Sequence, residues 1–102
     1  MEAPGALRVS GESQQAKLVK QVPPVYPEAA RQAGTSGVVR LGVIITKEGR
    51  VRDIRVMNSA GMGLDVAAMK AVKDWVYQPT LLNGEPVEVV TTVEVSFVPS
   101  GR

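Results

Sequence analysis

The sequence contains no cysteine and no histidine among its 102 residues. The missing cysteine excludes disulfides and thiol nucleophiles, and the two absences together exclude the usual zinc sites. Without histidine no Ser-His-Asp triad can form, so Ser36, Ser59 and Ser96 have no such base. Gly61 and Gly63 do not have the spacing of a phosphate-binding loop. We therefore expect a binding protein that is not an enzyme and needs no cofactor or metal.

An excess of charge and a long apolar run are also missing. The chain has 12 basic and 10 acidic side chains, a net charge of +2, which gives little reason to expect nucleic acid or an anionic membrane as a partner. The longest apolar run, Leu41 to Ile45, is far shorter than the roughly 20 residues of a membrane-spanning helix. The length suits one domain with a single core.

One segment, Leu64 to Val76, has a hydrophobic period that decides its structure without its neighbours. Its apolar residues recur at steps of three and four, which predicts a helix with one apolar stripe. A helix this short is marginal alone, so the stripe must pack on a sheet. The stripe consists of Leu64, Ala67, Ala68, Ala71, Val72 and Trp75.

The first part of the chain has weaker signals. Residues 1–16 are rich in Gly, Ser, Gln and Pro and indicate a flexible lead-in, although short strands at Leu7 to Val9 and Leu18 to Val22 remain open. A two-turn helix is expected next. Pro27 suits its first position, and Gly34 suits a left-handed C-terminal cap.

Two strands joined by a tight turn follow this helix. Residues 37–46 have apolar side chains on both faces, which indicates a central strand. The returning strand covers residues 51–57, with Ile54 and Val56 directed inward. Gly49 provides the positive φ that the short turn between the strands requires.

The last strand, Val87 to Phe97, alternates apolar and polar residues, so one face meets the core and the other meets water. A right-handed crossover through the main helix places strand 37–46 in the middle and this strand at an edge. The predicted fold is therefore α+β: a three-stranded antiparallel sheet of hairpin and edge strand, packed on one main helix, with a short helix before the first strand.

Several motifs, taken in order, resemble the C-terminal domain of the TonB energy-transducer family. The resemblance covers about residues 17–98, which we take as the folded domain, with residues 99–102 as a tail. The matching segments are Pro24 to Ala30, Gly37 to Val39, Lys47 to Val51, Leu64 to Ala68, Lys73 to Pro79, Asn83 to Val87 and Val93 to Phe97.

The resemblance implies a periplasmic domain, anchored in the inner membrane by an N-terminal helix and a proline-rich spacer. In that family the helix meets the proton-driven motor proteins ExbB and ExbD, and the periplasmic domain binds the TonB box of outer-membrane transporters, which import cargo such as siderophores. The present sequence has neither the membrane helix nor the spacer, so we expect an excised domain or a shortened relative.

The resemblance also implies where the partner binds. The TonB box adds as a strand to the edge strand, a mode in which main-chain hydrogen bonds supply the affinity. By this correspondence the predicted pairing positions lie on the last strand, and a second contact region precedes the first helix. The pairing positions are Val89, Val90, Thr91, Thr92, Val93 and Glu94, and the second region is Gln21, Val22, Pro23, Pro24, Val25 and Tyr26.

Other interpretations remain open at this point. The edge could be covered by residues 6–10 or 17–22 of the same chain, or by a second copy in a strand-exchanged homodimer. The domain could also be a TonB-like appendage of another envelope protein that binds cell wall or a protein. A basic patch for peptidoglycan is conceivable, although a solvated sheet face explains the same arginines: Arg40, Arg50, Arg52 and Arg55.

Overall fold

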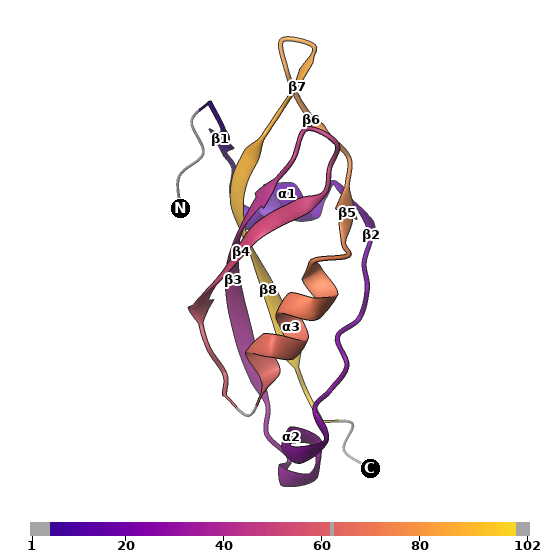
Figure 1. Ribbon diagram of the computed structural model, residues 1–102, viewed down its shortest axis with the longest axis vertical. Coiled ribbons are helices and arrows are strands. Elements are labelled where there is room, and N and C mark those ends of the chain that lie inside the picture. The colour runs from indigo at the N-terminus through magenta and orange to yellow at the C-terminus, as the bar shows by residue number, and fades with distance from the viewer. Residues whose placement is uncertain (1–4, 62, 100–102) are drawn as a thin grey trace.

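The computed structural model describes residues 5–61 and 63–99, which form helices and both short and long strands (Figure 1). No helix in these two ranges is long and apolar enough to span a membrane. The helices are α1 (Gly11–Gln15), α2 (Glu28–Ala33) and α3 (Leu64–Val72). The strands are β1 (Leu7–Arg8), β2 (Leu18–Lys20), β3 (Gly37–Ile45), β4 (Val51–Asn58), β5 (Val76–Tyr77), β6 (Thr80–Leu82), β7 (Glu85–Val87) and β8 (Val89–Phe97).

The main sheet has the strand order β1-β8-β3-β4. As predicted, β3 lies between two antiparallel neighbours, and its register with β8 runs from Gly37 opposite Phe97 to Ile45 opposite Val89. The prediction of three strands is wrong, because β1 joins as a fourth strand and pairs in parallel with the first residues of β8. A two-residue strand has too few side chains to show a period, so its partner decides that it forms.

The core lies between this sheet and α3. The odd-numbered residues of β3 and β8 face α3, as the alternation predicted, and Trp75 and Tyr77 close one end of the layer at 2% and 1% exposure. Trp75 is therefore the core residue that its position at the end of the apolar stripe indicates. The core members of the sheet are Val39, Leu41, Val43, Ile45, Val89, Val93, Val95 and Phe97.

Helix α3 is shorter than its apolar stripe. We predicted a helix to Val76, but α3 ends at Val72, and the chain makes a turn in which the Trp75 amide donates to the Val72 carbonyl at 3.0 Å. Two tertiary contacts stop the helix. The Trp75 indole Nε1 donates to the carbonyl of Val22 at 2.9 Å, and Val76 begins strand β5, which pairs with β2.

Helix α2 confirms the predicted two-turn helix with one small shift. Pro27 is the N-cap in extended conformation, so Glu28 and not Pro27 is the first helical residue. Gly34 takes the left-handed conformation at φ 68°, and its N–H reaches the carbonyls of Ala30 and Arg31. This is the glycine cap that the sequence predicted.

The turn at Asn83 and Gly84 belongs to a hairpin that the sequence analysis did not divide correctly. Both residues have positive φ, 54° and 83°, as a two-residue hairpin turn requires. The turn joins β6 to β7, so Val87 pairs with Thr80 and the last strand begins at Val89 instead of Val87.

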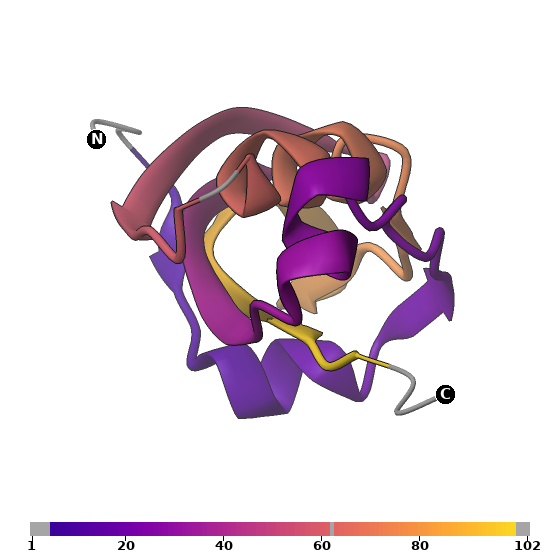
Figure 2. The ribbon, with the colours of Figure 1, turned by 90° about the horizontal axis from the view of Figure 1, so that it is seen from below.

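The lead-in contains more structure than its composition indicated. Beside β1, it forms α1, whose N-cap Ser10 accepts a hydrogen bond from the Ser13 amide at 3.1 Å. The second predicted short strand also forms, as β2, but it pairs with β5 and does not cover β8. Figure 2 shows α1 lying across β8, on the side of the strand away from α3.

Tyr77 gives the fold a dependence on alkaline pH. Burial raises the pKa of its phenol to about 12 from the ordinary 10.0, because the charged phenolate is poorly solvated there. The unfolded chain therefore loses this proton first, and stability should fall as the pH rises from about 10 toward 12. Tyr77→Phe should remove this part of the alkaline loss, which thermal unfolding at pH 8 and pH 11 would measure. An equal loss in both proteins would contradict the assignment.

Candidate functional site: the outer edge of β8

The side of β8 away from β3 presents main-chain hydrogen-bonding groups at every second residue. The carbonyl of Glu88 accepts from the Leu7 amide at 2.8 Å, and that of Val90 accepts from the Val9 amide at 3.1 Å. Because main-chain direction alternates along a strand, the groups of Thr92, Glu94 and Ser96 point to this outer side as well. No strand within residues 5–61 and 63–99 pairs with these three residues there.

The lead-in covers one part of this edge and leaves the rest beside a groove. Strand β1 lies along Val89 and Val90, and Gly11 at the start of α1 lies against Thr92. Beyond that point a groove of about 700 Å³ borders β8. The groove is lined by Ser10, Gly11, Glu12, Gln15, Gln21, Arg40, Thr92, Val93, Glu94 and Ser96.

Cross-strand ion pairs neutralise the acidic side chains that could have protected this edge. Arg40 on β3 stands opposite Glu94 in the register, and its Nη2 lies 2.6 Å from a carboxylate oxygen. Arg52 on β4 reaches Glu88 at 3.0 Å and Asp53 at 2.7 Å. Exposed pairs of this kind contribute at most about 1 kcal/mol, so their main effect is to hold the carboxylates over the sheet.

The predicted pairing residues on β8 divide by face. The side chains of Val89, Thr91 and Val93 are buried in the core, so only their main chain pairs, and it pairs with β3. Val90 and Thr92 are half-buried on the outer face, and Glu94 is exposed. Their role in binding a partner stays a prediction, for which Thr92 and Glu94 have the suitable main-chain direction and Val90 is already paired with β1.

The second predicted region, residues 21–26, is an extended segment that runs down beside α3 to α2 (Figure 1). Gln21 alone of this segment lines the groove at β8. Tyr26 meets the far end of β8, where its ring packs edge-on against Phe97 at 5.5 Å between centroids, and its hydroxyl donates to the carbonyl of Thr35.

The middle of that segment lines a different groove. Val22, Pro23 and Val25 form one wall of an apolar groove of about 520 Å³, and α3 forms the other. Val25 is 81% exposed, and Pro24 is half-buried. The structure therefore brings Gln21 together with the β8 edge, but it does not bring Val22 to Val25 there.

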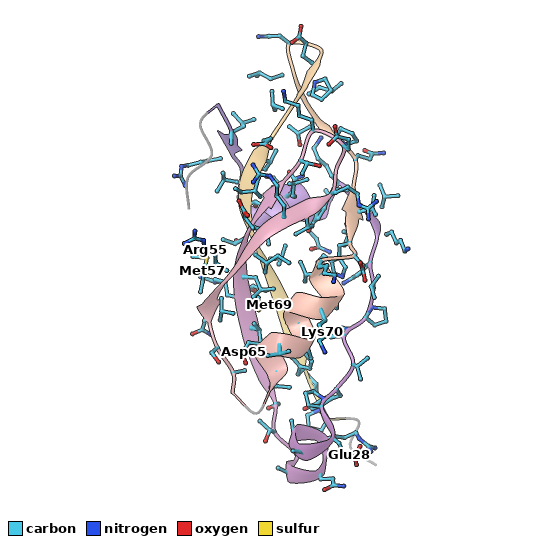
Figure 3. All side chains as sticks on the ribbon, viewed as in Figure 1. Glu28, Arg55, Met57, Asp65, Met69 and Lys70 are labelled. Carbon is cyan, nitrogen blue, oxygen red and sulfur yellow. The ribbon has the colours of Figure 1, made fainter. Side chains whose placement is uncertain are left out.

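The opposite edge of the sheet, β4, is poorly suited to accept a strand. Its pairing with β3 shifts register twice, and Asp53 has a positive φ of 52°. Such irregularities bend a strand and interrupt its row of pairing groups, which is a common protection of exposed edges. Arg55 and Met57 project from β4 on the side away from α3 (Figure 3). Of the two edges, β8 has the regular ladder.

The groove residues contributed by the lead-in were missed by the sequence analysis. Composition indicated a flexible segment, whereas Ser10, Gly11, Glu12 and Gln15 form one wall of the groove. A local signal was present in Ser10 and Ser13, which have the spacing of an N-cap and its third helical residue. Nothing local indicated that this helix would contact β8.

The groups that this site offers to a ligand are main-chain hydrogen-bond donors and acceptors of β8. Across residues 5–61 and 63–99, no group of three or more acidic side chains is placed to hold a metal ion. The groove is lined mostly by polar residues, among them Thr92, Glu94 and Ser96, whose main-chain groups point to the outer side of β8. An extended peptide could satisfy those groups by adding a strand, with its alternate side chains in the groove.

Comparison with known proteins assigns the family. The family model described as the Gram-negative bacterial TonB protein C-terminal matches residues 22–99. This chain belongs to the TonB C-terminal domain family. This match confirms the TonB resemblance inferred from the motifs. It includes all of β8, whereas β1 and α1 precede it.

Individual TonB proteins agree with the family match. The chain is 32% identical over 78 residues to protein TonB of Vibrio cholerae and 37% identical over 76 residues to protein TonB of Xanthomonas campestris. These alignments cover 76% and 74% of the chain but only 32% and 34% of the relatives. The chain thus spans about a third of the length of these TonB proteins.

Solved structures show the same fold. The solution NMR structure of the Pseudomonas aeruginosa TonB C-terminal domain aligns with a TM-score of 0.70 at 31% identity, covering 84% of this chain and 88% of that one. The TonB2 protein from Vibrio anguillarum aligns with a TM-score of 0.64 at 34% identity, covering 98% and 95%. The mixed α+β class predicted from the sequence is confirmed by both.

Proposed function

We propose that this domain is the partner-binding part of a TonB-type energy transducer. It binds the TonB box of outer-membrane transporters by strand addition to the outer edge of β8. Through that contact it couples the proton motive force of the inner membrane to active import. Family membership supports the general role, and the geometry of β8 supports the mode of binding.

One observation carries the proposal: Glu94 and Ser96 both line the groove and turn main-chain groups to the outer side of β8, and no strand of the described chain pairs with them there. An added strand would satisfy an N–H and a C=O of each residue, and the same number of groups on itself. Because Arg40 holds the Glu94 carboxylate over the sheet face, the charge does not block the edge. Gln21 borders the groove and would meet the partner's side chains.

The proposed role needs parts of the protein that correspond to the remaining length of its TonB relatives. An N-terminal membrane helix and a spacer would anchor this domain in the periplasm to the inner membrane and connect it to ExbB and ExbD. The domain itself would supply the grip on the transporter. A regular ladder suits this task, since pulling along a strand loads several hydrogen bonds together.

The alternative of a cell-wall-binding appendage has less support. A basic patch of arginines on the sheet would favour peptidoglycan, but Arg40 is paired with Glu94 and Arg52 with Glu88 and Asp53. These pairs reduce the positive potential on that face. Strand addition needs only the outward main-chain groups of β8, so it explains this surface better than peptidoglycan binding does.

The test is an NMR titration of the 15N-labelled domain with peptides from the N-termini of TonB-dependent transporters encoded in the same genome. We expect amide shifts centred on Glu94 and Ser96, extending to Gln21, with slower hydrogen exchange at the first two. A peptide of the same composition in scrambled order is the control. Amide shifts of the domain on titration with peptidoglycan fragments, but with no transporter peptide, would refute the proposal and favour the appendage.

A further inference from the structure

The lead-in lies on β8 in the way that a partner strand would. Leu7 and Val9 donate to the outward carbonyls of Glu88 and Val90 at 2.8 and 3.1 Å, so β1 uses the same row of main-chain groups as an added strand. We call residues 7–15, comprising β1 and α1, the lead-in strap. The strap fills the first part of the edge and leaves the second part, at Glu94 and Ser96, beside the groove.

The strap makes a close contact with β8 where β1 gives way to α1, between Gly11 and Thr92. Gly11 approaches Thr92 so closely that an added Cβ would lie 2.7 Å from the Thr92 carbonyl oxygen and 3.0 Å from its Oγ1. The nearer of these atoms belongs to the main chain and cannot move away alone. Helix α1 therefore closes the edge at Thr92, and a strand added at Glu94 and Ser96 cannot extend further while the strap is in place.

The strap has few main-chain pairs with β8, although Val9 packs against the core. Only Leu7 and Arg8 are in register with β8. Its most buried side chain, Gln14, is 1% exposed, yet neither its amide nitrogen nor its amide oxygen has a hydrogen-bond partner in the described residues. A buried polar group without a partner costs about 1–3 kcal/mol, which makes docking of the strap less favourable. Segments of this kind open locally much more easily than the core.

We propose that the lead-in strap is an intramolecular competitor of the partner strand: it occupies the edge of β8 and must leave for the full length of the edge to pair. This regulation rests on the proposed function. The measured affinity for a partner is then lowered in proportion to the fraction of molecules in which the strap is released. A pulling force or a binding partner that acts on the chain before residue 7 would change the fraction of molecules with a released strap.

A removable cross-link tests this competition in the full chain. Arg8 and Val90 are direct partners in the parallel register, and adjacent strands lie about 4.8 Å apart, within the range that a disulfide spans. Because the natural sequence has no cysteine, Arg8→Cys combined with Val90→Cys can form only one intramolecular disulfide. Oxidation locks the strap, and reduction of the same protein releases it, so each sample is its own control.

Affinity for a fluorescein-labelled TonB-box peptide, chosen as in the titration above, is measured in both redox states. We expect binding to be at least about tenfold weaker in the oxidised form. A second variant, Gly11→Ala, should push α1 away from Thr92 and tighten binding several-fold in the otherwise natural chain. Ser13→Ala, an exposed change in the same helix, controls for helix propensity and should have little effect.

The outcomes separate this inference from the proposed function. Equal affinity in the oxidised and reduced forms, with peptide shifts still at Glu94 and Ser96, would overturn the competition and leave the binding edge standing. Absence of binding in both redox states and in Gly11→Ala, with all proteins folded by NMR, would overturn the binding edge and the competition together.

Discussion

Glu94→Pro is expected to weaken binding of a TonB-box peptide by roughly 10- to 100-fold while the domain stays folded. The Glu94 main chain points away from β3, so proline removes no hydrogen bond of the β3–β8 ladder. It does remove the N–H offered to an added strand, and leaves the partner's carbonyl without a donor, which costs about 1–3 kcal/mol. Fluorescence anisotropy measures the affinity, and the dispersion of the NMR spectrum reports the fold.

Glu94→Ala is the matched control, because it removes the ion pair with Arg40 but keeps the main-chain N–H. We expect it to change the affinity by less than about fivefold, the limit for an exposed pair. If the proline variant is folded and binds as well as the alanine variant, then strand addition at Glu94 is wrong. Proline at Thr92 is less informative, since Gly11 already lies against that residue.

Gly49→Ala is expected to lower the free energy of unfolding by more than about 3 kcal/mol. Gly49 has φ 87°, which alone costs an alanine about 1–2 kcal/mol. In addition, a Cβ would lie 2.0 Å from the main-chain carbonyl oxygen of Tyr77, so the β3–β4 turn and β5 would have to separate. Separation would also strain the hydrogen bond from the Tyr77 amide to the Gly49 carbonyl, which is 2.9 Å long.

Gly34→Ala separates the conformational cost from the clash. Gly34 has a similar positive φ of 68°, but an added Cβ there would meet no atom within 4 Å. We expect this variant to lose only the roughly 1–2 kcal/mol of the left-handed conformation. Urea unfolding of both variants measures the difference. Equal losses would show that the close approach of the β3–β4 turn to β5 does not contribute to stability.

The approach of Gly49 to Tyr77 matters for the site because it fixes one end of the extended segment. Tyr77 pairs with Leu18, and the Trp75 indole donates to the Val22 carbonyl. These contacts place the chain on either side of Gln21, which borders the groove. The turn predicted from a single glycine thus contributes to the position of a candidate binding residue that lies far from it in the sequence.

Much of the fold that supports the candidate site was predictable because its determinants are local. The alternation along β8 predicted its buried face, and the two-faced pattern of β3 predicted a central strand. The stripe of α3 predicted the core contacts of Leu64 and Trp75, both of which are buried. The apolar period of the sequence extends beyond the end of α3. Trp75 lies in the core although it follows the helix, because a turn and the hydrogen bond from its indole to the Val22 carbonyl place it there.

The state of the β8 edge was not predictable in this way. The composition of residues 1–16 indicates weak packing, but a short segment can still pair wherever an unfilled row of main-chain groups is near. Main-chain hydrogen bonds depend little on side chains, so the sequence left a short strand at Leu7 to Val9 open and did not indicate its partner. The need for glycine at position 11 likewise could not be predicted, because it arises only when the folded chain brings Gly11 against Thr92.

By itself, the sequence determined the strands with a clear period, the glycine turns, the main helix and the resemblance to the TonB family, because each depends on residues close together in the chain. Only the tertiary structure decided where α3 ends, that β6 and β7 form a hairpin, and that β1 and α1 cover part of β8. These features depend on contacts between distant segments. The part of the edge that stays open, at Glu94 and Ser96, is a result of the same contacts.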